Sequence, residues 1–253
     1  MPNVAASTKD APARRIASNK QAVDPPMHAE MSLPRPTTTP ATPTSPTWTR
    51  LLLPVAALVT LAGYVGPWIP HAAAGLVVTG LDFAEYVKFL HPIRSGELSV
   101  WREGFYLPLV AVSLALSLNA YRRDLAYAWP IRLFLLGIAV VSALNLLPPA
   151  WSPAVLRNQE FRLQVFALVC CLGAVAIGPL LALLPRSILG LTSAVLSLAA
   201  LIVPVLQFWR ILPAIETIYA HAVTPGWGVW IMILGLLGLL AASLRISLKG
   251  SRT

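Results

Sequence analysis

Six long apolar runs follow residue 50, and they constrain the fold of this chain more than any other feature. The runs cover residues 51–70, 104–121, 131–147, 163–184, 187–209 and 227–244. A helix needs about 20 predominantly apolar residues to cross the hydrocarbon core of a bilayer. Because the peptide groups of such a run must be hydrogen-bonded within it, each run is expected to be helical. The sequence therefore predicts an all-α, polytopic bundle of about six transmembrane helices over residues 50–253.

The composition supports a membrane environment. Only 11% of the residues are charged and 57% are hydrophobic, whereas soluble domains carry about 25% charged residues. The net charge of +9 would suggest a nucleic-acid partner in a soluble protein. Here the Lys and Arg residues lie beside the apolar runs, which is typical of orientation signals and lipid headgroup contacts. We expect the lipid bilayer as a partner and no nucleic acid.

Residues 1–49 predict a disordered cytoplasmic tail. Nine of the 23 prolines fall before residue 49, and residues 34–46 read PRPTTTPATPTSP. Such a segment cannot bury enough apolar surface to offset the entropy cost of ordering it. Two alternatives are an organelle transit peptide and a signal peptide that includes the first apolar run and is cleaved near residues 72–74.

The outer segment, residues 71–103, is the one sizeable polar insertion between predicted spans and holds four of the ten acidic residues. Asp82 and Glu85 resemble a capping box that starts a helix over residues 83–90, which Pro92 would end. The apolar positions of this helix share one face: Phe83, Val87 and Leu90. We therefore expect a short amphipathic helix that lies along the membrane surface.

Aromatic and basic residues indicate how the bundle is oriented. All eight tryptophans fall near a predicted helix end, as in an aromatic belt at the two interfaces. With the N-terminus inside, the inner segments carry 13 basic and four acidic residues, whereas the outer segments carry six of each. The positive-inside rule then places both termini in the cytoplasm of a cell-membrane protein.

Short links and small residues predict how the helices pack. The links at residues 122–130 and 185–186 favour antiparallel neighbours on either side. Pairs of small residues four apart, which allow helices to approach closely, occur within three of the runs. These pairs are Ser113–Ser117, Ala174–Gly178 and Ser193–Ser197.

Polar side chains in and beside the outer segment are candidates for docking a partner. The candidate residues are Asp82, Glu85, Tyr86, Lys88, Glu97, Arg102 and Glu103. Glu85 and Lys88 are three apart, so an ordinary intrahelical ion pair also explains them. Asp82 and Glu85 could act as acid and base, but carboxylates at a helix start more often cap the helix.

Three histidines, His71, His91 and His221, are weak candidates for a metal site on the outer face. Histidine and carboxylate side chains are the ligands that zinc prefers. The spacing argues against such a site, because none of the three belongs to an HExxH or HxH pattern. We expect no metal and no cofactor, and interpret these histidines as interfacial residues.

The missing residues restrict the function. No Asp, Glu, Lys, Arg or His lies at the middle of any predicted span, which argues against proton-coupled carriers and voltage sensors. No nucleophile elbow, phosphate-binding loop or dinucleotide-binding glycine pattern is present, which argues against an enzyme.

Three hypotheses follow. The leading one is a non-catalytic subunit or accessory of a membrane assembly, which docks a membrane protein or a second copy of the chain through residues 72–103. The alternatives are a permease-like carrier or channel for a small neutral or lipophilic solute, and an outer-face metal-dependent enzyme.

Overall fold

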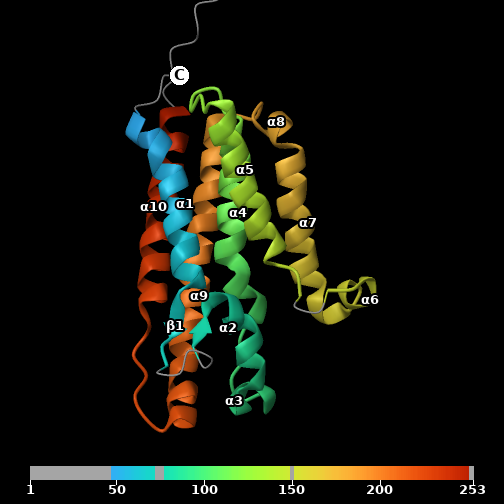
Figure 1. Cartoon of the computed structure of the whole chain (residues 1–253), viewed down its shortest axis with the longest axis vertical. Helices are drawn as coiled ribbons and strands as arrows, with labels where there is room; N and C mark the ends of the chain where they lie inside the picture. Colours follow the sequence, from blue (N-terminus) through green and yellow to red (C-terminus); the bar gives the residue numbers. More distant parts are fainter. Residues whose placement is uncertain (1–46, 72–76, 149–150, 251–253) are drawn as a thin grey trace, which may run out of the picture. The chain divides into compact units, whose positions relative to one another are not determined.

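The computed structural model describes residues 47–71, 77–148 and 151–250, and the predicted tail lies almost wholly outside them. The described residues confirm the all-α class, with one two-stranded hairpin as the exception (Figure 1). Four helical stretches are long and apolar enough to cross a membrane: Arg102–Ala120, Gln159–Ala176, Arg186–Tyr219 and Trp227–Leu248. Two shorter apolar helices cover Arg50–Val65 and Trp129–Leu144. By length and hydropathy, these four stretches are candidate membrane spans.

The α-helices are α1 (Thr47–Val65), α2 (Gly80–Tyr86), α3 (His91–Arg94), α4 (Leu107–Ala120), α5 (Trp129–Leu144), α6 (Pro153–Leu156), α7 (Arg162–Ala176), α8 (Gly178–Leu181), α9 (Arg186–Tyr219) and α10 (Trp227–Gly250). Short 3-10 helices are η2 (Val87–Phe89), η3 (Arg102–Tyr106) and η4 (Gln159–Phe161). Strands β1 (Pro67–Ile69) and β2 (Val78–Thr79) pair antiparallel.

Helix α4 is the central helix of the bundle. It packs against α1, α5, α7 and α9, and 83% of the stretch Arg102–Ala120 is buried. The Ser113 hydroxyl donates a hydrogen bond to the Ala139 carbonyl of α5 at 2.9 Å. Ser113 therefore supports the close approach of α4 and α5 that its spacing from Ser117 predicts.

The helix pair with the most extensive contact, α1 with α10, was not anticipated from the sequence. The two helices run antiparallel and meet backbone to backbone at glycines (Figure 1). A Cβ atom added at Gly63 would overlap the backbone nitrogen of Met232, and one at Gly235 would overlap the backbone nitrogen of Thr60. We call these contacts the glycine seam.

None of the six predicted spans keeps its exact bounds in the structure, and three of the differences have a clear physical reason. The run at residues 51–70 is helical only to Val65, because β1 begins at Pro67. The run at residues 163–184 is interrupted after Ala176, and Pro179, which has no N–H to donate, lies in the first turn of α8.

Helix α9 differs most, since it continues ten residues past the predicted end at Trp209. Its 34 residues correspond to about 51 Å, which exceeds a hydrocarbon core of about 30 Å. The extension is explained by burial, because Ile211 and Ile215 are fully covered by the protein.

The prediction of antiparallel neighbours is confirmed for α4 and α5 and wrong for α7 and α9. Helix α7 packs on α4 and α5, whereas α9 packs on α10 and α4. The reason is that α8 lies in the link between α7 and α9, so the link is longer than the two-residue turn that the sequence suggested.

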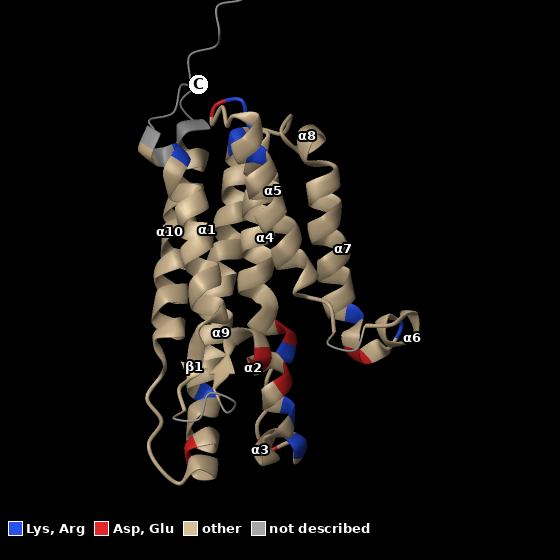
Figure 2. Ribbon diagram, viewed as in Figure 1, with Lys and Arg blue, Asp and Glu red and all other residues tan. Residues whose placement is uncertain are grey.

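Basic residues gather at one end of the bundle (Figure 2). Arg50 donates a hydrogen bond to the Ala126 carbonyl at 2.6 Å, and Arg122 pairs with Asp124 at 3.0 Å. The Arg245 guanidinium lies 4.3 Å from the centroid of the Trp48 ring. The opposite end, where the outer segment lies, carries a mixed band of acidic and basic residues. We call it the outer end.

Candidate functional site at the outer end

The outer segment starts its first helix with a capping box one turn earlier than predicted. Thr79 is the N-cap of α2: its hydroxyl accepts from the Asp82 N–H at 3.3 Å, and the Asp82 carboxylate accepts from the Thr79 N–H at 3.4 Å. Asp82 is therefore the N3 residue of the box, three positions after the N-cap, and not the N-cap itself. The helix breaks at Leu90, which is extended, and Pro92 lies in the first turn of α3 and does not end a helix.

The apolar face of this helix is covered by protein. Phe83, Val87 and Leu90 are all at most 2% exposed. The Phe83 ring centroid lies 4.9 Å from that of Phe105 and 5.4 Å from that of Phe208. The prediction of a helix lying along the membrane surface is therefore wrong, because its apolar face belongs to an aromatic core at the outer end.

Trp68 belongs to the same core and not to an aromatic belt. It is fully buried, and its ring centroid lies 5.5 Å from that of Phe83. The other seven tryptophans are all at least 40% exposed: Trp48, Trp101, Trp129, Trp151, Trp209, Trp227 and Trp230. Seven of the eight tryptophans are therefore exposed as an aromatic belt requires, and Trp68 is not.

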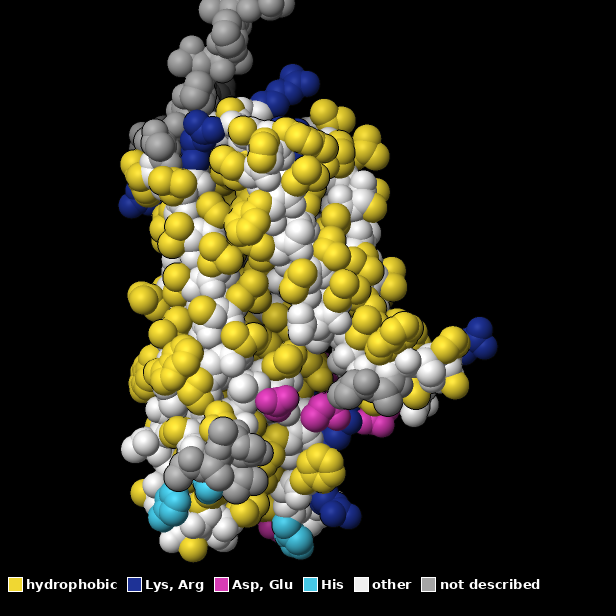
Figure 3. All heavy atoms as spheres, in the orientation of Figure 1, with side chains coloured by type: hydrophobic (Ala, Val, Ile, Leu, Met, Phe, Trp, Pro, Cys, Tyr) yellow, Lys and Arg dark blue, Asp and Glu magenta, His cyan; other side chains and the backbone are white. Residues whose placement is uncertain are grey.

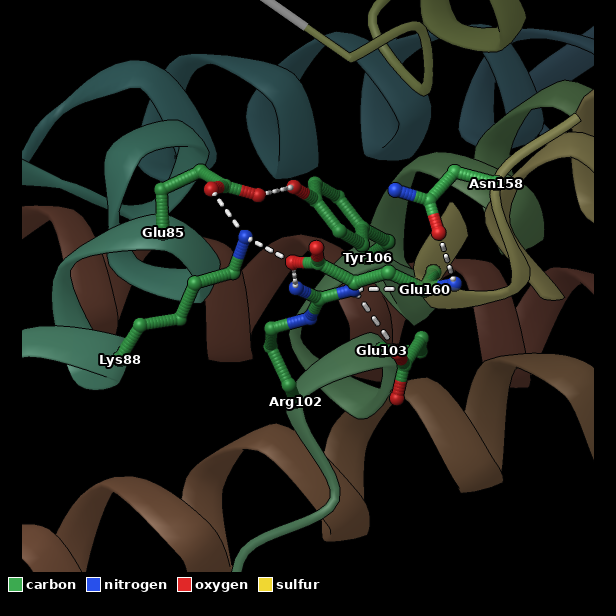
Figure 4. A network of polar contacts seen from close by, with 7 residues as sticks. All are labelled: Glu85, Lys88, Arg102, Glu103, Tyr106, Asn158 and Glu160. Atoms are coloured by element: carbon green, nitrogen blue, oxygen red, sulfur yellow. Dashed lines mark hydrogen bonds and ion pairs between the residues drawn. The ribbon is translucent and has the colours of Figure 1, made fainter. Parts of the chain in front are cut away.

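A charged network crosses from the outer segment to the chain before α7 (Figure 4). The Lys88 Nζ lies 2.6 Å from a carboxylate oxygen of Glu85 and 2.6 Å from one of Glu160. This confirms the Glu85–Lys88 ion pair. Arg102 donates to the same Glu160 oxygen at 2.7 Å and to the Glu160 carbonyl at 3.0 Å. Glu160 thus joins two basic residues that lie far from it in the sequence.

The network has further contacts that hold it in place. Arg102 pairs with Glu103 at 3.1 Å. The Lys88 Nζ and the Arg102 guanidinium lie 5.2 Å and 5.6 Å from the Phe161 ring centroid. Each exposed ion pair contributes little by itself. Together they fasten η4 and the start of α7 to the outer segment.

Four of the seven docking candidates, Glu85, Lys88, Arg102 and Glu103, meet in this network. Asp82 lies in the capping box, and the exposed Glu97 accepts a hydrogen bond from the Ser95 hydroxyl at 3.0 Å. Tyr86 faces Tyr219 of α9 instead. Burial, followed by the interaction with Tyr219, raises the pKa of Tyr86 to about 12. Sequence reasoning missed Glu160, although it is an acidic residue directly before a predicted span.

The three histidines do not form a metal centre. His71 and His221 flank the Tyr219 ring, each with a ring-centroid distance of 5.9 Å, whereas His91 begins α3. Within the described ranges, no three His, Cys, Asp or Glu side chains lie close enough together to hold a metal ion.

A cavity of about 440 Å³ adjoins the charged network. Its polar lining includes Asp82, Glu85 and the Tyr106 hydroxyl, which donates to Glu85 at 3.4 Å. The rest of its lining comes mainly from the end of α5 and from Trp151. We call it the polar chamber. Figure 3 shows acidic side chains gathered at this level, next to the largely hydrophobic surface of the bundle.

An apolar groove of about 300 Å³ adjoins the polar chamber, and the two share the lining residues Leu81 and Asn145. Its rim is apolar and exposed, with Val65 of α1 and Val141 of α5 both 57% exposed. Its floor includes the buried Leu109 of α4. The groove is therefore open at the exposed, apolar rim between α1 and α5.

No family model, curated protein or solved structure matches this chain.

Proposed function

We propose that the chain is a six-span protein of the cell membrane, with both termini in the cytoplasm, that binds a lipophilic solute entering from the bilayer. The observation that supports binding most directly is the apolar groove between α1 and α5, with its exposed rim and its polar chamber. Such a site is the first requirement of the permease-like carrier that the sequence offered as an alternative. The lack of Asp, Glu, Lys, Arg and His at the middle of the predicted spans favours a solute whose binding is not coupled to protons.

The two shorter apolar helices are included as spans because of their exposed surfaces. In α1, Leu51 and Val55 are 59% and 52% exposed, and in α5, Phe134 is 55% exposed. Apolar patches of this kind need lipid or a partner to cover them. The basic end of the bundle supports the cytoplasmic placement of both termini, since Arg50 near the start of α1 and Arg245 near the end of α10 lie there.

A photoreactive lipophile tests the proposed binding. The full chain in lipid nanodiscs is irradiated with a dodecyl maltoside that carries a diazirine on its tail, and labelled peptides are identified by mass spectrometry. We expect labelling of the α1 and α5 residues that line the groove, in excess of labelling on the exposed face of α7. Ala62→Trp, which fills the groove from α1, should abolish this excess.

Gly173→Trp is the matched control, because a Cβ atom at Gly173 of α7 meets open space and the side chain lies away from the groove. Labelling that is equal on all lipid-facing helices, and unchanged by Ala62→Trp, would contradict the proposed function.

A second candidate is the accessory role, with docking through residues 72–103. Most charged groups of this segment are held in contacts within the chain, so the surface left for a partner is aromatic. Phe89 is 75% exposed and Trp101 is 49% exposed, and such residues are enriched at protein interfaces. The expected partner is another membrane protein or a second copy of the chain.

In-cell photo-crosslinking from position 89, with position 129 at the opposite end as the control, tests this role. A specific adduct from position 89 supports docking, and its mass separates a dimer from a complex with another protein. If position 89 gives no adduct, and gently extracted protein has only the 27.2 kDa mass of one chain, the accessory role is wrong.

A further inference from the structure

We infer that the ligand of the groove is an amphiphile with an ammonium head group, which the polar chamber binds while the tail occupies the apolar groove. This inference rests on the proposed function and names the class of molecule that the site takes. It depends on the charge of the polar chamber, on its aromatic rings and on its continuity with the groove.

The charge of the polar chamber favours a cation. Among the described residues that line it, Asp82 and Glu85 are the charged ones. Lys88 pairs with Glu85 and Glu160, and Arg102 pairs with Glu160 and Glu103. These two basic groups neutralise part of the acidic charge. Counting Asp82 and the members of the charged network, four carboxylates face two basic groups. An anionic head group in the chamber would therefore be repelled.

The aromatic rings of the chamber favour an ammonium ion in particular. Tyr106 and Trp151 line the same space as the two carboxylates. The face of an aromatic ring attracts a cation, and quaternary ammonium groups are recognised by such rings. Trp151 is 66% exposed, so its ring is accessible to a ligand. A metal ion fits less well, since the polar chamber supplies two carboxylates and Asp82 is already bonded to Thr79.

The groove gives the ligand its direction. It extends along α1 from Val65 to Leu58, away from the acidic residues and toward the middle of the bundle. Seven residues of helix correspond to about 10 Å. An amphiphile in this position has its head at the outer end and its tail parallel to the helices, as a membrane lipid does. Asn145, which lines both spaces, marks the boundary between head and tail.

Three photoreactive probes with the same dodecyl diazirine tail test the head group. Their heads are trimethylammonium, sulfate and maltoside, and the full chain is again held in nanodiscs. For each probe, groove labelling is divided by labelling on the exposed face of α7, around Phe166. This ratio removes differences between the probes in how strongly they partition into the bilayer. We expect a ratio about tenfold higher for trimethylammonium than for sulfate, with maltoside between them.

Substitutions in the polar chamber should remove the preference for the trimethylammonium probe over the sulfate probe. Asp82→Asn together with Glu85→Gln removes the charge while the amide oxygens can still accept the hydrogen bonds from Thr79 and Tyr106. Trp151→Leu should lower the trimethylammonium ratio, and Trp151→Phe should restore most of it. Trp129→Leu, at a similarly exposed tryptophan of the opposite end, is the control.

Equal ratios for the three heads, with groove labelling still lost in Ala62→Trp, would overturn the ammonium inference and keep the proposed function. Absence of groove labelling by every probe would overturn the proposed function itself. Competition with dodecylphosphocholine identifies the source of the ammonium group. Displacement of the trimethylammonium probe supports a choline-type lipid, and no displacement supports a free cationic amphiphile.

Discussion

At the residue scale, Glu160 is the side chain on which the charged network depends, because its carboxylate pairs with both Lys88 and Arg102. Glu160→Gln would leave these two basic groups close together with one fewer carboxylate. The Glu160 side chain is 45% exposed, so the expected loss of stability is at most about 1 kcal/mol. Locally, we expect faster amide hydrogen exchange in α6 and η4, since their attachment to the outer segment is weakened.

Hydrogen exchange followed by mass spectrometry measures this effect. Glu97→Gln is the matched control, because Glu97 is also an exposed acidic residue of the outer end and contacts Ser95. If both variants exchange at the same rate as the unmodified protein in α6 and η4, the network does not hold these elements in place.

The contacts of the charged network differ in how far they could be predicted from the sequence. The Glu85–Lys88 pair was predictable, because a spacing of three on a helix brings two side chains together. The pairing of Lys88 with Glu160, which lies 72 residues away, was not, because it depends on where the chain before α7 is placed by packing. The polar chamber depends on the same placement, and only Asp82 and Glu85 among its lining residues were predicted as candidates.

At the element scale, the glycine seam predicts that a large side chain between α1 and α10 destabilises the protein. Gly235→Leu would drive a side chain into the backbone of Thr60, and the helices would have to separate. Overpacking of this kind typically costs about 1–3 kcal/mol, and a backbone contact leaves less room for relaxation. We expect a lower midpoint of thermal unfolding in detergent, together with loss of the monodisperse peak in size-exclusion chromatography.

Gly137→Leu in α5 is the control for this prediction, because a Cβ atom at Gly137 has no neighbour within 4 Å. It should unfold at the same temperature as the unmodified protein or slightly higher, since leucine is the better helix former. Equal destabilisation by both substitutions would mean that helix propensity or insertion, and not the seam, determines the stability.

The helices themselves were largely predictable from hydropathy, whereas their ends were not. The length of an apolar run does not show whether protein or lipid covers it, which is why α9 passes Trp209 and the apolar face of α2 is buried. The glycine seam was missed because its glycines lie on two helices that are far apart in the sequence. Only the fold shows that Gly63 faces Met232.

At the scale of the whole molecule, the number of spans decides where the polar chamber lies. If α5 crosses the membrane, the links before and after it lie on opposite sides. If it does not, these links lie on the same side. Arg123 and Arg157 are exposed residues of the two links, so a single cysteine at each position tests the six-span arrangement directly. The native Cys170 and Cys171 are first replaced by alanine.

We expect Arg157→Cys to react with a membrane-impermeant maleimide in intact cells, and Arg123→Cys to react only after permeabilisation. This outcome puts the basic end in the cytoplasm, as the positive-inside rule requires, and places the mouth of the polar chamber on the outer face. If both positions react under the same condition, the two links lie on the same side of the membrane, and α5 does not cross it. Reaction of Arg123→Cys alone in intact cells would show that the protein has the opposite orientation in the membrane. The polar chamber would then take its amphiphile from the cytoplasmic leaflet.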